Sequence, residues 1–275
     1  MAQTINTNLV SLNAQRNLSM SQGSLATSMQ RLSSGLRVNS AKDDAAGLAI
    51  ADRMQTQVRG MNVAIRNAND GISLAQTAEG AIGKVGDMLQ RMRELAVQSA
   101  NATNGIDDRK NLNAEYKQLS DEITRTLSNT RFNGLAILGT DSGAQTFQVG
   151  ADAGDQIVIT TANLVTDMGG TGIAAGDLLD APNSTTALGN IDAALTLVNG
   201  ERAQYGATQN RFEAVIDTLR VASENQSAAR GRIMDADYAQ ETANMSRAQI
   251  LQQAGTAMVA QANQLPQQVL QLLKG

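Results

Sequence analysis

The chain has 275 residues, of which 42% are hydrophobic, so it is long enough to bury a core in one large domain or in two. Its net charge is only −4, and it has no cluster of Lys and Arg interleaved with aromatic residues, which argues against nucleic-acid binding. The absence of Cys and His excludes disulfides, zinc–thiolate sites, thiol catalysis and the commonest general base at neutral pH.

The first predicted helix occupies the N-terminal region and ends near Gly35 and Asn39, which are residue types that favour helix C-termini. Apolar residues recur there at helical spacing, with one change of phase. This stripe consists of Ile5, Leu9, Leu12, Leu18, Leu25, Met29, Leu32 and Leu36.

A second helix is predicted to begin at Ser40–Asp43, where a serine precedes an acid by three residues. Apolar residues between 58 and 96 alternate steps of three and four, so this helix forms a long rod. The polar run Asn101–Gly105 ends it. Asp107 and Asp108 then favour the start of a shorter helix, which we expect to pack antiparallel to the rod.

Between Asn133-Gly134 and about Thr185 the helical period disappears, and Gly, Asp and Thr become frequent. Residues 145–150 and 156–161 read as two strands of a hairpin. Residues 167–182 are predicted to form a loop.

Helical periodicity returns from Leu188 to Ile233, with several polar residues in the stripe, and such residues can set the register of a helix pair. Residues 230–237 are predicted to form a joint. The tail beyond it has no charged residue between Arg247 and Lys274, and Pro266 is expected to kink or break its helix. Its stripe consists of Leu251, Gly255, Met258, Ala262, Leu265, Val269 and Leu272.

The pattern predicts a mainly α fold of long antiparallel helical rods in coiled-coil-like packing, with a small β-hairpin insert and paired N- and C-terminal helices. The predicted parts are a terminal helical pair, a helical bundle and an insert; they comprise residues 1–42 with 238–275, residues 43–134 with 186–237, and residues 135–185. The terminal stripes are thin and contain many small residues. We therefore expect them either to pair within the monomer or to stay underburied until many copies stack.

The sequence offers no catalytic site. Gly170–Ala175 resembles a dinucleotide-binding loop but does not follow a strand in a βαβ unit. Asp43 and Asp44 lack a third metal ligand nearby and fit a solvated helix start better. We therefore predict that the protein is not an enzyme and binds no cofactor or metal.

Five segments closely resemble bacterial flagellins and occur in the same order along the chain. They cover roughly residues 2–138 and 188–273, which is too long and specific a match to arise by chance. The segments are Arg31–Leu36 continuing through Asn39–Ile50, Gln90–Asn101, Arg131–Gly134, Ala229–Tyr238, and the tail with Ala262–Leu270.

The resemblance implies a subunit that self-assembles into the bacterial flagellar filament for motility. The terminal pair would form the inner core, the helical bundle the outer core, and the insert the exposed surface. This is a short form, in which the outer domains of longer flagellins are absent. Filament-core packing is then expected of Leu9, Leu12, Leu25, Met29, Leu32, Leu251, Met258, Leu265, Val269 and Leu272.

The resemblance also implies a location and partners. The N-terminus has no cleavable secretory signal, and no run approaches the roughly 18 apolar residues of a membrane span. Export through the flagellar type III apparatus is expected, with a chaperone at the C-terminal helix, giving a secreted, extracellular protein in the bacterial flagellum. Hook-associated and cap proteins are further expected partners, whereas nucleic acid and membrane insertion are not.

A receptor site follows from the same likeness. Residues of the Gln90–Asn101 segment match the patch by which many flagellins bind the Toll-like receptor that senses them, an innate immune receptor. The same patch is implied in subunit stacking. It consists of Arg91, Glu94, Leu95, Gln98 and Glu115.

Two rival functions remain. A hook–filament junction protein would share the terminal stripes, although the intact Gln90–Asn101 segment and the short insert favour the filament. A secreted translocator that inserts helices into membranes should carry a long apolar segment or a basic polar face, and neither is present.

Overall fold

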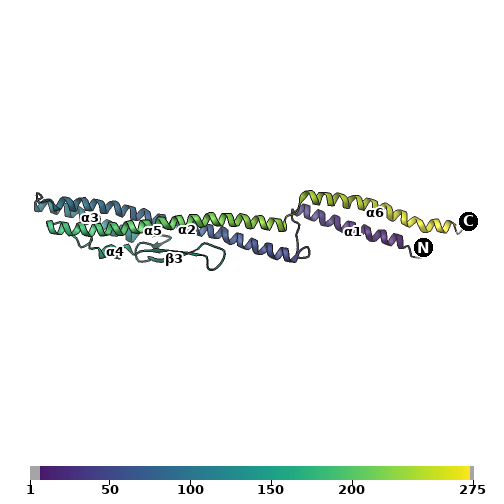
Figure 1. Cartoon of the computed structure of the whole chain (residues 1–275), viewed down its shortest axis with the longest axis horizontal. Helices are drawn as coiled ribbons and strands as arrows, with labels where there is room; N and C mark the ends of the chain where they lie inside the picture. The colour runs from purple at the N-terminus through teal and green to yellow at the C-terminus, as the bar shows by residue number, and fades with distance from the viewer. Residues whose placement is uncertain (1–6, 273–275) are drawn as a thin grey trace. The chain divides into compact units, whose positions relative to one another are not determined.

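The computed structural model describes residues 7–272, with side chains described as far as Gln264. The fold is mainly α-helical with two small antiparallel strand pairs (Figure 1), which confirms the predicted fold class. The elements in chain order are α1 (Leu9–Ser34), α2 (Ala45–Ala100), α3 (Ile106–Asn129), β1 (Arg131–Phe132), β2 (Leu135–Ala136), β3 (Gly143–Gln148), β4 (Gln156–Thr161), α4 (Leu164–Gly170), α5 (Ala181–Met234) and α6 (Tyr238–Leu272).

The chain divides into two compact units, which are described separately. The terminal unit comprises Met1–Thr56 and Asn225–Gly275, and the bundle unit comprises Gln57–Glu224. The boundaries fall inside α2 and α5, because each of these helices contributes its main length to the bundle unit and one end to the terminal unit.

In the bundle unit, α3 and α5 pack against α2 around one apolar core. Contacts run in opposite directions along α2 and α5, since Gly71 of α2 lies beside Phe212 and Gly86 lies beside Val198. This antiparallel packing is the arrangement expected from the stripes of threes and fours. The largest fully buried side chains include Tyr116, Tyr205, Phe212, Ile82, Leu89, Met92 and Leu95.

Polar residues of the seam meet across α2 and α5. The side-chain amide of Gln209 donates a hydrogen bond to the carboxylate of Glu79 at 2.9 Å, and Arg202 lies 4.0 Å from the other oxygen of the same carboxylate. Further along, Arg93 donates to Asp192 at 2.7 Å. Because these directional contacts fit one alignment, they favour a single register between the two helices.

The β3–β4 hairpin pairs Gly143 with Thr161 at one end and Gln148 with Gln156 at the other, so β3 begins two residues earlier than predicted. Alternate residues of β4 point inward, as the period of a half-buried strand requires. The hairpin is fastened to the helices at two points. Asn67 donates to the carbonyl of Gln148 at 2.9 Å, and the Phe147 ring meets the Phe212 ring edge to face at 5.8 Å.

The predicted loop at 167–182 is wrong at both ends, because α5 already begins at Ala181 and because α4 covers Leu164–Gly170. The Asn163 side chain caps this helix by accepting a hydrogen bond from the Thr166 amide at 3.2 Å. Leu164 and Met168, one helical turn apart, are buried in the core. Tertiary burial therefore holds a helix that is too short to show a period in the sequence.

A second hairpin, β1–β2, was not predicted. Its turn residues, Asn133 and Gly134, both have positive φ values, 48° and 86°. Two left-handed residues in succession form the turn that joins twisted antiparallel strands most readily. The Asn-Gly pair was therefore a usable hairpin signal.

In the terminal unit, α1 and α6 lie side by side along their length and run antiparallel (Figure 1), as predicted for the first and last helices. Helix α1 ends where its sequence indicated, since Gly35 adopts the left-handed conformation with φ 70° and its N–H donates to Arg31. Helix α6 extends to Leu272, so the helix continues past Pro266 and does not end there.

The joint of the terminal unit ties the end of α1 to the start of α6. Leu36 and Asp235 form an antiparallel bridge, and the Ala236 N–H donates to the Gly35 carbonyl at 3.0 Å. Val38 and Met234 are buried together beneath it. The joint therefore has a small core of its own.

Helix α2 begins later than the predicted start at Ser40–Asp43. Asp43 instead accepts hydrogen bonds from the backbone of Asn39 and Ser40, which closes a tight turn. The next acid, Asp44, accepts from the Gly47 N–H at 2.8 Å at the helix start. Asp43 thus closes the turn, and Asp44 caps the start of α2.

Candidate assembly and binding surfaces

The buried side of α6 is a row of small residues. Ala248, Gly255 and Ala262 are seven residues apart and face α1, and the alanines are 4% and 3% exposed. A Cβ built on Gly255 would lie 3.1 Å from Leu18 Cδ1. Small residues at heptad spacing let the two helices approach closely, and a Cβ opposite Leu18 would require the flexible Leu18 side chain to shift by a few tenths of an ångström.

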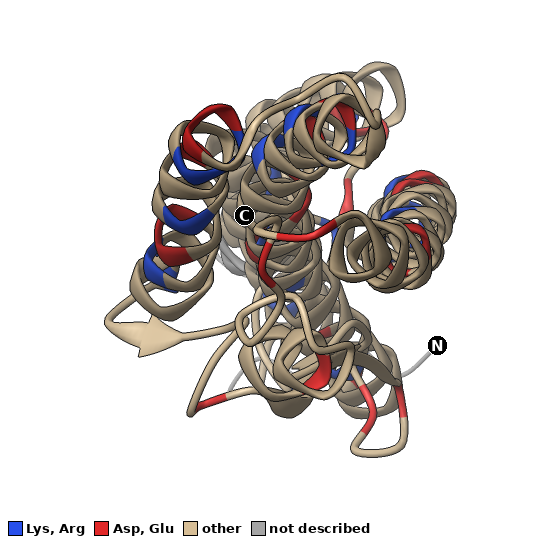
Figure 2. Cartoon of the chain, turned by 90° about the vertical axis from the view of Figure 1, so that its left-hand side faces the viewer, with Lys and Arg blue, Asp and Glu red and all other residues tan. Residues whose placement is uncertain are grey.

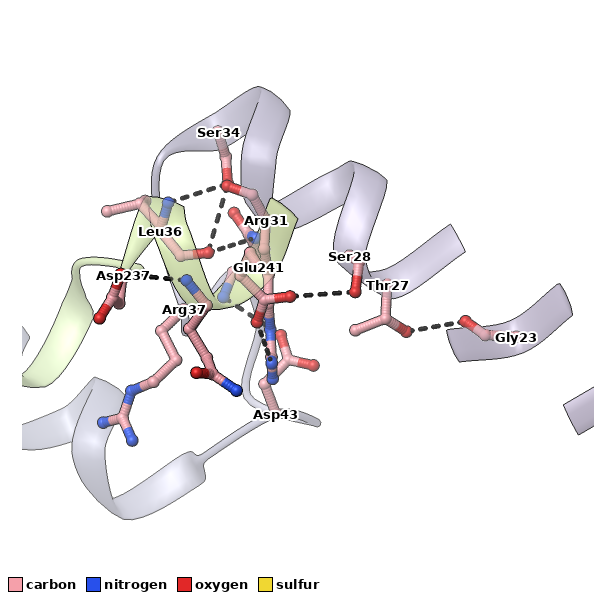
Figure 3. A network of polar contacts seen from close by, with 12 residues as sticks. Gly23, Thr27, Ser28, Arg31, Ser34, Leu36, Arg37, Asp43, Asp237 and Glu241 are labelled. Carbon is pink, nitrogen blue, oxygen red and sulfur yellow. Dashed lines mark hydrogen bonds and ion pairs between the residues drawn. The ribbon is translucent and has the colours of Figure 1, made fainter. Parts of the chain in front are cut away.

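The same row contains one acid, Glu241, which is 6% exposed. Its Oε2 accepts a hydrogen bond from Ser28 Oγ at 3.0 Å, and its Oε1 pairs with Arg31 Nη1 at 3.0 Å (Figure 3). Burial acts to raise the pKa of Glu241, but the bonds from Arg31 and Ser28, the Arg31 charge and a bond with Asn244 together hold it below the ordinary value. The carboxylate is therefore stabilised in its charged form.

At the far end of the pair the contacts are uncharged. Asn8 caps α1 by accepting from the Ser11 N–H at 3.1 Å, and its amide donates to the Ala262 carbonyl at 2.7 Å. Ser11 Oγ donates to Asn263 Oδ1, also at 2.7 Å. Hydrogen bonds thus join the two helices at both ends, with apolar and small residues between them.

Of the seven residues predicted to pack in a filament core whose side chains are described, five are exposed on this pair. Leu25 and Leu32 are partly buried, and the side chains of Leu265, Val269 and Leu272 lie outside the described residues. The exposed members are Leu9 (68%), Leu12 (52%), Met29 (56%), Leu251 (51%) and Met258 (61%).

This exposure revises the view of the tail as one seam. Gly255 and Ala262 face α1, whereas Leu251 and Met258 lie at the edge of the contact, where they line an open groove with Leu18 of α1 and remain more than half exposed. Ala248 and Glu241, which the sequence analysis did not assign to the seam, occupy it instead. The chain by itself therefore leaves a large apolar surface uncovered on its terminal helices.

The second surface lies on α2 and α3 of the bundle unit. Arg91 Nε donates to Glu115 Oε1 at 2.9 Å, and Arg91 Nη1 pairs with Glu94 Oε2 at 2.9 Å. Hydrogen bonds to Glu115 and then Glu94 raise the pKa of Arg91. All three side chains are well exposed, so these pairs hold the surface in shape more than they stabilise the fold.

Two predicted members of that surface differ in placement. Gln98 is exposed, beside Arg93 and Val97. Leu95 is only 1% exposed, because it lies on the face of α2 that also carries Met92 and Ala96 into the core. Its assignment to a surface patch is corrected: in this structure Leu95 supports the patch from beneath. Val97, half-exposed next to the patch, was missed by the sequence analysis.

Neither surface resembles a catalytic centre. Among residues 7–272 no group of three or more acidic side chains is placed to hold a metal ion. None of the helices in that range is long and apolar enough to cross a bilayer. In the view of Figure 2, Lys and Arg are interspersed with Asp and Glu along the helices. The fold and the two surfaces define a mainly α-helical protein whose paired terminal helices keep large apolar side chains uncovered.

Comparison with known proteins identifies the family. The model of the bacterial flagellin N-terminal helical region matches residues 5–142, and that of the C-terminal helical region matches residues 188–273. A flagellin of Halalkalibacterium halodurans is 47% identical over 270 residues, which cover 98% of this chain and 99% of that protein. The chain belongs to the bacterial flagellin family, and it is a structural subunit of the flagellar filament used for motility.

Other relatives differ from this chain in length but share its fold. Flagellin A of Vibrio anguillarum is 36% identical, with 100% of both chains covered by an alignment of 379 residues, so parts of that longer protein have no counterpart here. The crystal structure of Bacillus cereus flagellin has a TM-score of 0.52 at 32% identity and covers 60% of this chain and 94% of that one. A putative flagellar hook-associated protein from Vibrio parahaemolyticus shares the fold alone, with a TM-score of 0.58 at 14% identity over 70% of this chain and 100% of that one.

Proposed function

We propose that filament assembly covers the exposed apolar residues of α1 and α6 with the same helices of neighbouring copies. The observation that carries this proposal is the combination of large exposed side chains and scarce charge on these helices. Met258 is 61% exposed, and the helix around it has no charged residue beyond Arg247. A surface of this kind is costly in water and suits a polymer interior.

In this proposal residues 1–42 and 238–275 form the inner core of the filament. Residues 43–134 and 186–237 form the outer core, and residues 135–185 lie at the surface. Leu9, Leu12, Met29, Leu251 and Met258 contact other copies. Leu25, Leu32, Leu265, Val269 and Leu272 are assigned to the same packing by their place in the stripes.

The test compares Met258→Asp with Met258→Leu. The aspartate places an unpaired charge in a crowded apolar contact, so it should abolish elongation onto filament seeds, whereas leucine should elongate as the parent does. Both variants should keep the parent's helical content, because Met258 is exposed in the single chain. Normal elongation of Met258→Asp would count against the proposal, and a loss of helicity would place Met258 in the core of the single chain.

We further propose that the chain leaves the cell by the flagellar type III route and becomes part of an extracellular filament. A chaperone that covers the apolar face of α6 until export, and cap and hook-associated proteins at the filament ends, complete this account. The exposed Leu251 and Met258 support the chaperone proposal, because such a face needs cover in a cytoplasm. Copurification of a partner with the full chain, lost when residues after Met245 are removed, tests it.

We also propose that the α2–α3 surface serves both subunit stacking and binding of the flagellin-sensing Toll-like receptor. Arg91, Glu94, Gln98 and Glu115 present the contact groups, with Leu95 beneath them. Arginine is one of the residue types enriched in binding hot spots, and half-exposed Val97 adds apolar area beside it.

A further inference from the structure

The buried network of Ser28, Arg31 and Glu241 stands apart from the rest of the α1–α6 contact. Both oxygens of the Glu241 carboxylate are engaged, each at 3.0 Å, and the Glu241 side chain is 8% exposed against 30% for Arg31 (Figure 3). The other charged residues of these helices are Arg16 and Arg247. Glu241 is thus the sole acid of α1 and α6, and it lies inside the contact.

The remaining contacts do little to choose between alignments of the two helices. Ala248, Gly255 and Ala262 follow each other at seven-residue steps, so a slip of seven residues replaces one small residue by another. At the far end, the same slip brings Thr256 to the place of Asn263, and its hydroxyl can also accept a bond from Ser11. Packing of small residues therefore tolerates the slip.

The same slip separates the charged pair. It would carry Glu241 opposite Ser21 and Ser24, which offer no cation, and it would leave Arg31 without its carboxylate. An uncompensated charge in a buried contact is strongly unfavourable, whereas the intact pair adds little net stability over apolar residues. A buried polar group that costs stability but selects one alignment is a known use of such residues in coiled coils.

We propose that the Ser28–Arg31–Glu241 network fixes the register of α1 against α6. The network lies about one helical turn from the joint, where Leu36 bridges Asp235. The joint aligns the end of α1 with the start of α6, and the network keeps the two helices in that alignment. Arg31 and Glu241 act as positioning residues. The alternative is that the joint alone sets the register, in which case the charged pair is dispensable.

The test uses introduced cysteine pairs as register reporters, which is clean because the chain has no Cys. A Cβ on Gly255 lies 3.6 Å from Leu18 Cβ, within the range of a disulfide, so Leu18→Cys with Gly255→Cys reports the register seen here. Leu18→Cys with Ala248→Cys reports the seven-residue slip. Each pair is oxidised in the full-length chain, unseeded and after growth onto filament seeds, and linked peptides are quantified by mass spectrometry.

Three backgrounds separate register from stability. With Arg31 and Glu241 intact, a disulfide should form between positions 18 and 255 and not between positions 18 and 248. In Arg31→Met with Glu241→Leu, apolar side chains keep the helices paired, so circular dichroism should stay at the parent level while the ratio of slipped to native links rises roughly fivefold or more. The charge swap, Arg31→Glu with Glu241→Arg, should restore the parent ratio.

Two results would overturn the proposal. An unchanged ratio in the Arg31→Met and Glu241→Leu background would show that the joint sets the register without the charged pair. Absence of the native link from the parent, both unseeded and seeded, would show that α1 and α6 are not held in this alignment at all.

Discussion

The carboxylate of Glu241 makes the terminal helix pair sensitive to acid. Its pKa is held below the ordinary value of 4.5, because the bonds from Arg31 and Ser28 outweigh the opposing effect of burial. A group with a depressed pKa contributes stability above its unfolded-state pKa and loses that contribution as pH falls through the folded-state value. The groups around it are Ser28 and Arg31 of α1 and Asn244 of α6, and Arg31 also interacts with the charge of Asp43 in the turn before α2.

We therefore predict that the α1–α6 pair loosens as the pH is lowered below about 4.5. Glu241→Gln should weaken the pair at neutral pH and remove this step from the acid titration. Hydrogen exchange of α1 and α6 peptides, corrected for the intrinsic effect of pH, measures it. Asp52→Asn, an exposed acid of the same unit, is the control and should titrate as the parent does. Parallel curves for the parent and Glu241→Gln would contradict the assignment.

Gly71 is a second residue whose role is set by close contact. A Cβ at this position would lie 2.7 Å from Cζ of Phe212, the ring that also meets Phe147 of the hairpin. Gly71 therefore leaves room for the aromatic contact that fastens β3–β4 to the bundle unit.

Gly71→Ala should lower the free energy of unfolding by about 2 kcal/mol relative to Gly80→Ala, because overpacking outweighs the gain in helix propensity. Gly80 is the matched control, since it lies in the same helix with nothing within 4 Å of an added Cβ, and its substitution should stabilise slightly. Urea unfolding of both variants measures the difference. Equal stability would mean that the Phe212 ring moves aside at little cost.

At the residue level, the sequence could indicate classes of position but not their neighbours. Apolar residues such as Met258 were predicted to pack against other helices. That they are exposed in the single chain could be seen only in the structure. Glu241 was missed because an acid near a helix start ordinarily reads as solvated. Leu95 was placed on the surface by likeness, whereas the structure buries it in the same core as Met92.

At the level of elements, the long helices were predictable because each carries many turns of one period. The stripes of α2 and α5 are repeated often enough to reveal both helices and their antiparallel contact. The β3–β4 hairpin was found from alternation and its turn. Helix α4 escaped because seven residues span only about two turns, and its stability comes from burial of Leu164 and Met168.

The contact between α2 and α3 supports a prediction about recognition. Arg91 bridges the two helices through Glu115 and holds Glu94 beside it. Arg91→Ala should reduce signalling by the flagellin-sensing receptor about tenfold or more in a reporter cell line, as expected for loss of an arginine hot spot. Thermal unfolding should change little, because the ion pairs are exposed.

Arg125→Ala is the matched control for this prediction. Arg125 also pairs with an acid, Glu122, but within α3 and away from the patch. It should signal as the parent does. Equal potency of the Arg91 and Arg125 variants would remove the α2–α3 surface from the receptor proposal.

For the whole molecule, the division of apolar residues between the two units explains how a single chain can be both folded and ready to polymerise. The bundle unit buries a continuous core that includes Tyr116, Tyr205 and Phe212. The terminal unit pairs its helices through small residues and leaves large ones such as Leu9 and Met258 outside. Burial of those residues on assembly offsets the cost of ordering the ends.

The measurement that tests this account most directly is seeded assembly of the full chain beside a chain truncated after Met245. Short sonicated filaments are added to each, and elongation is followed by negative-stain electron microscopy. The account predicts long filaments from the full chain alone, with the truncated chain folded in its bundle unit but unable to extend the seeds. Elongation by the truncated chain, or failure of both folded chains on intact seeds, would contradict the claim that the uncharged tail drives assembly.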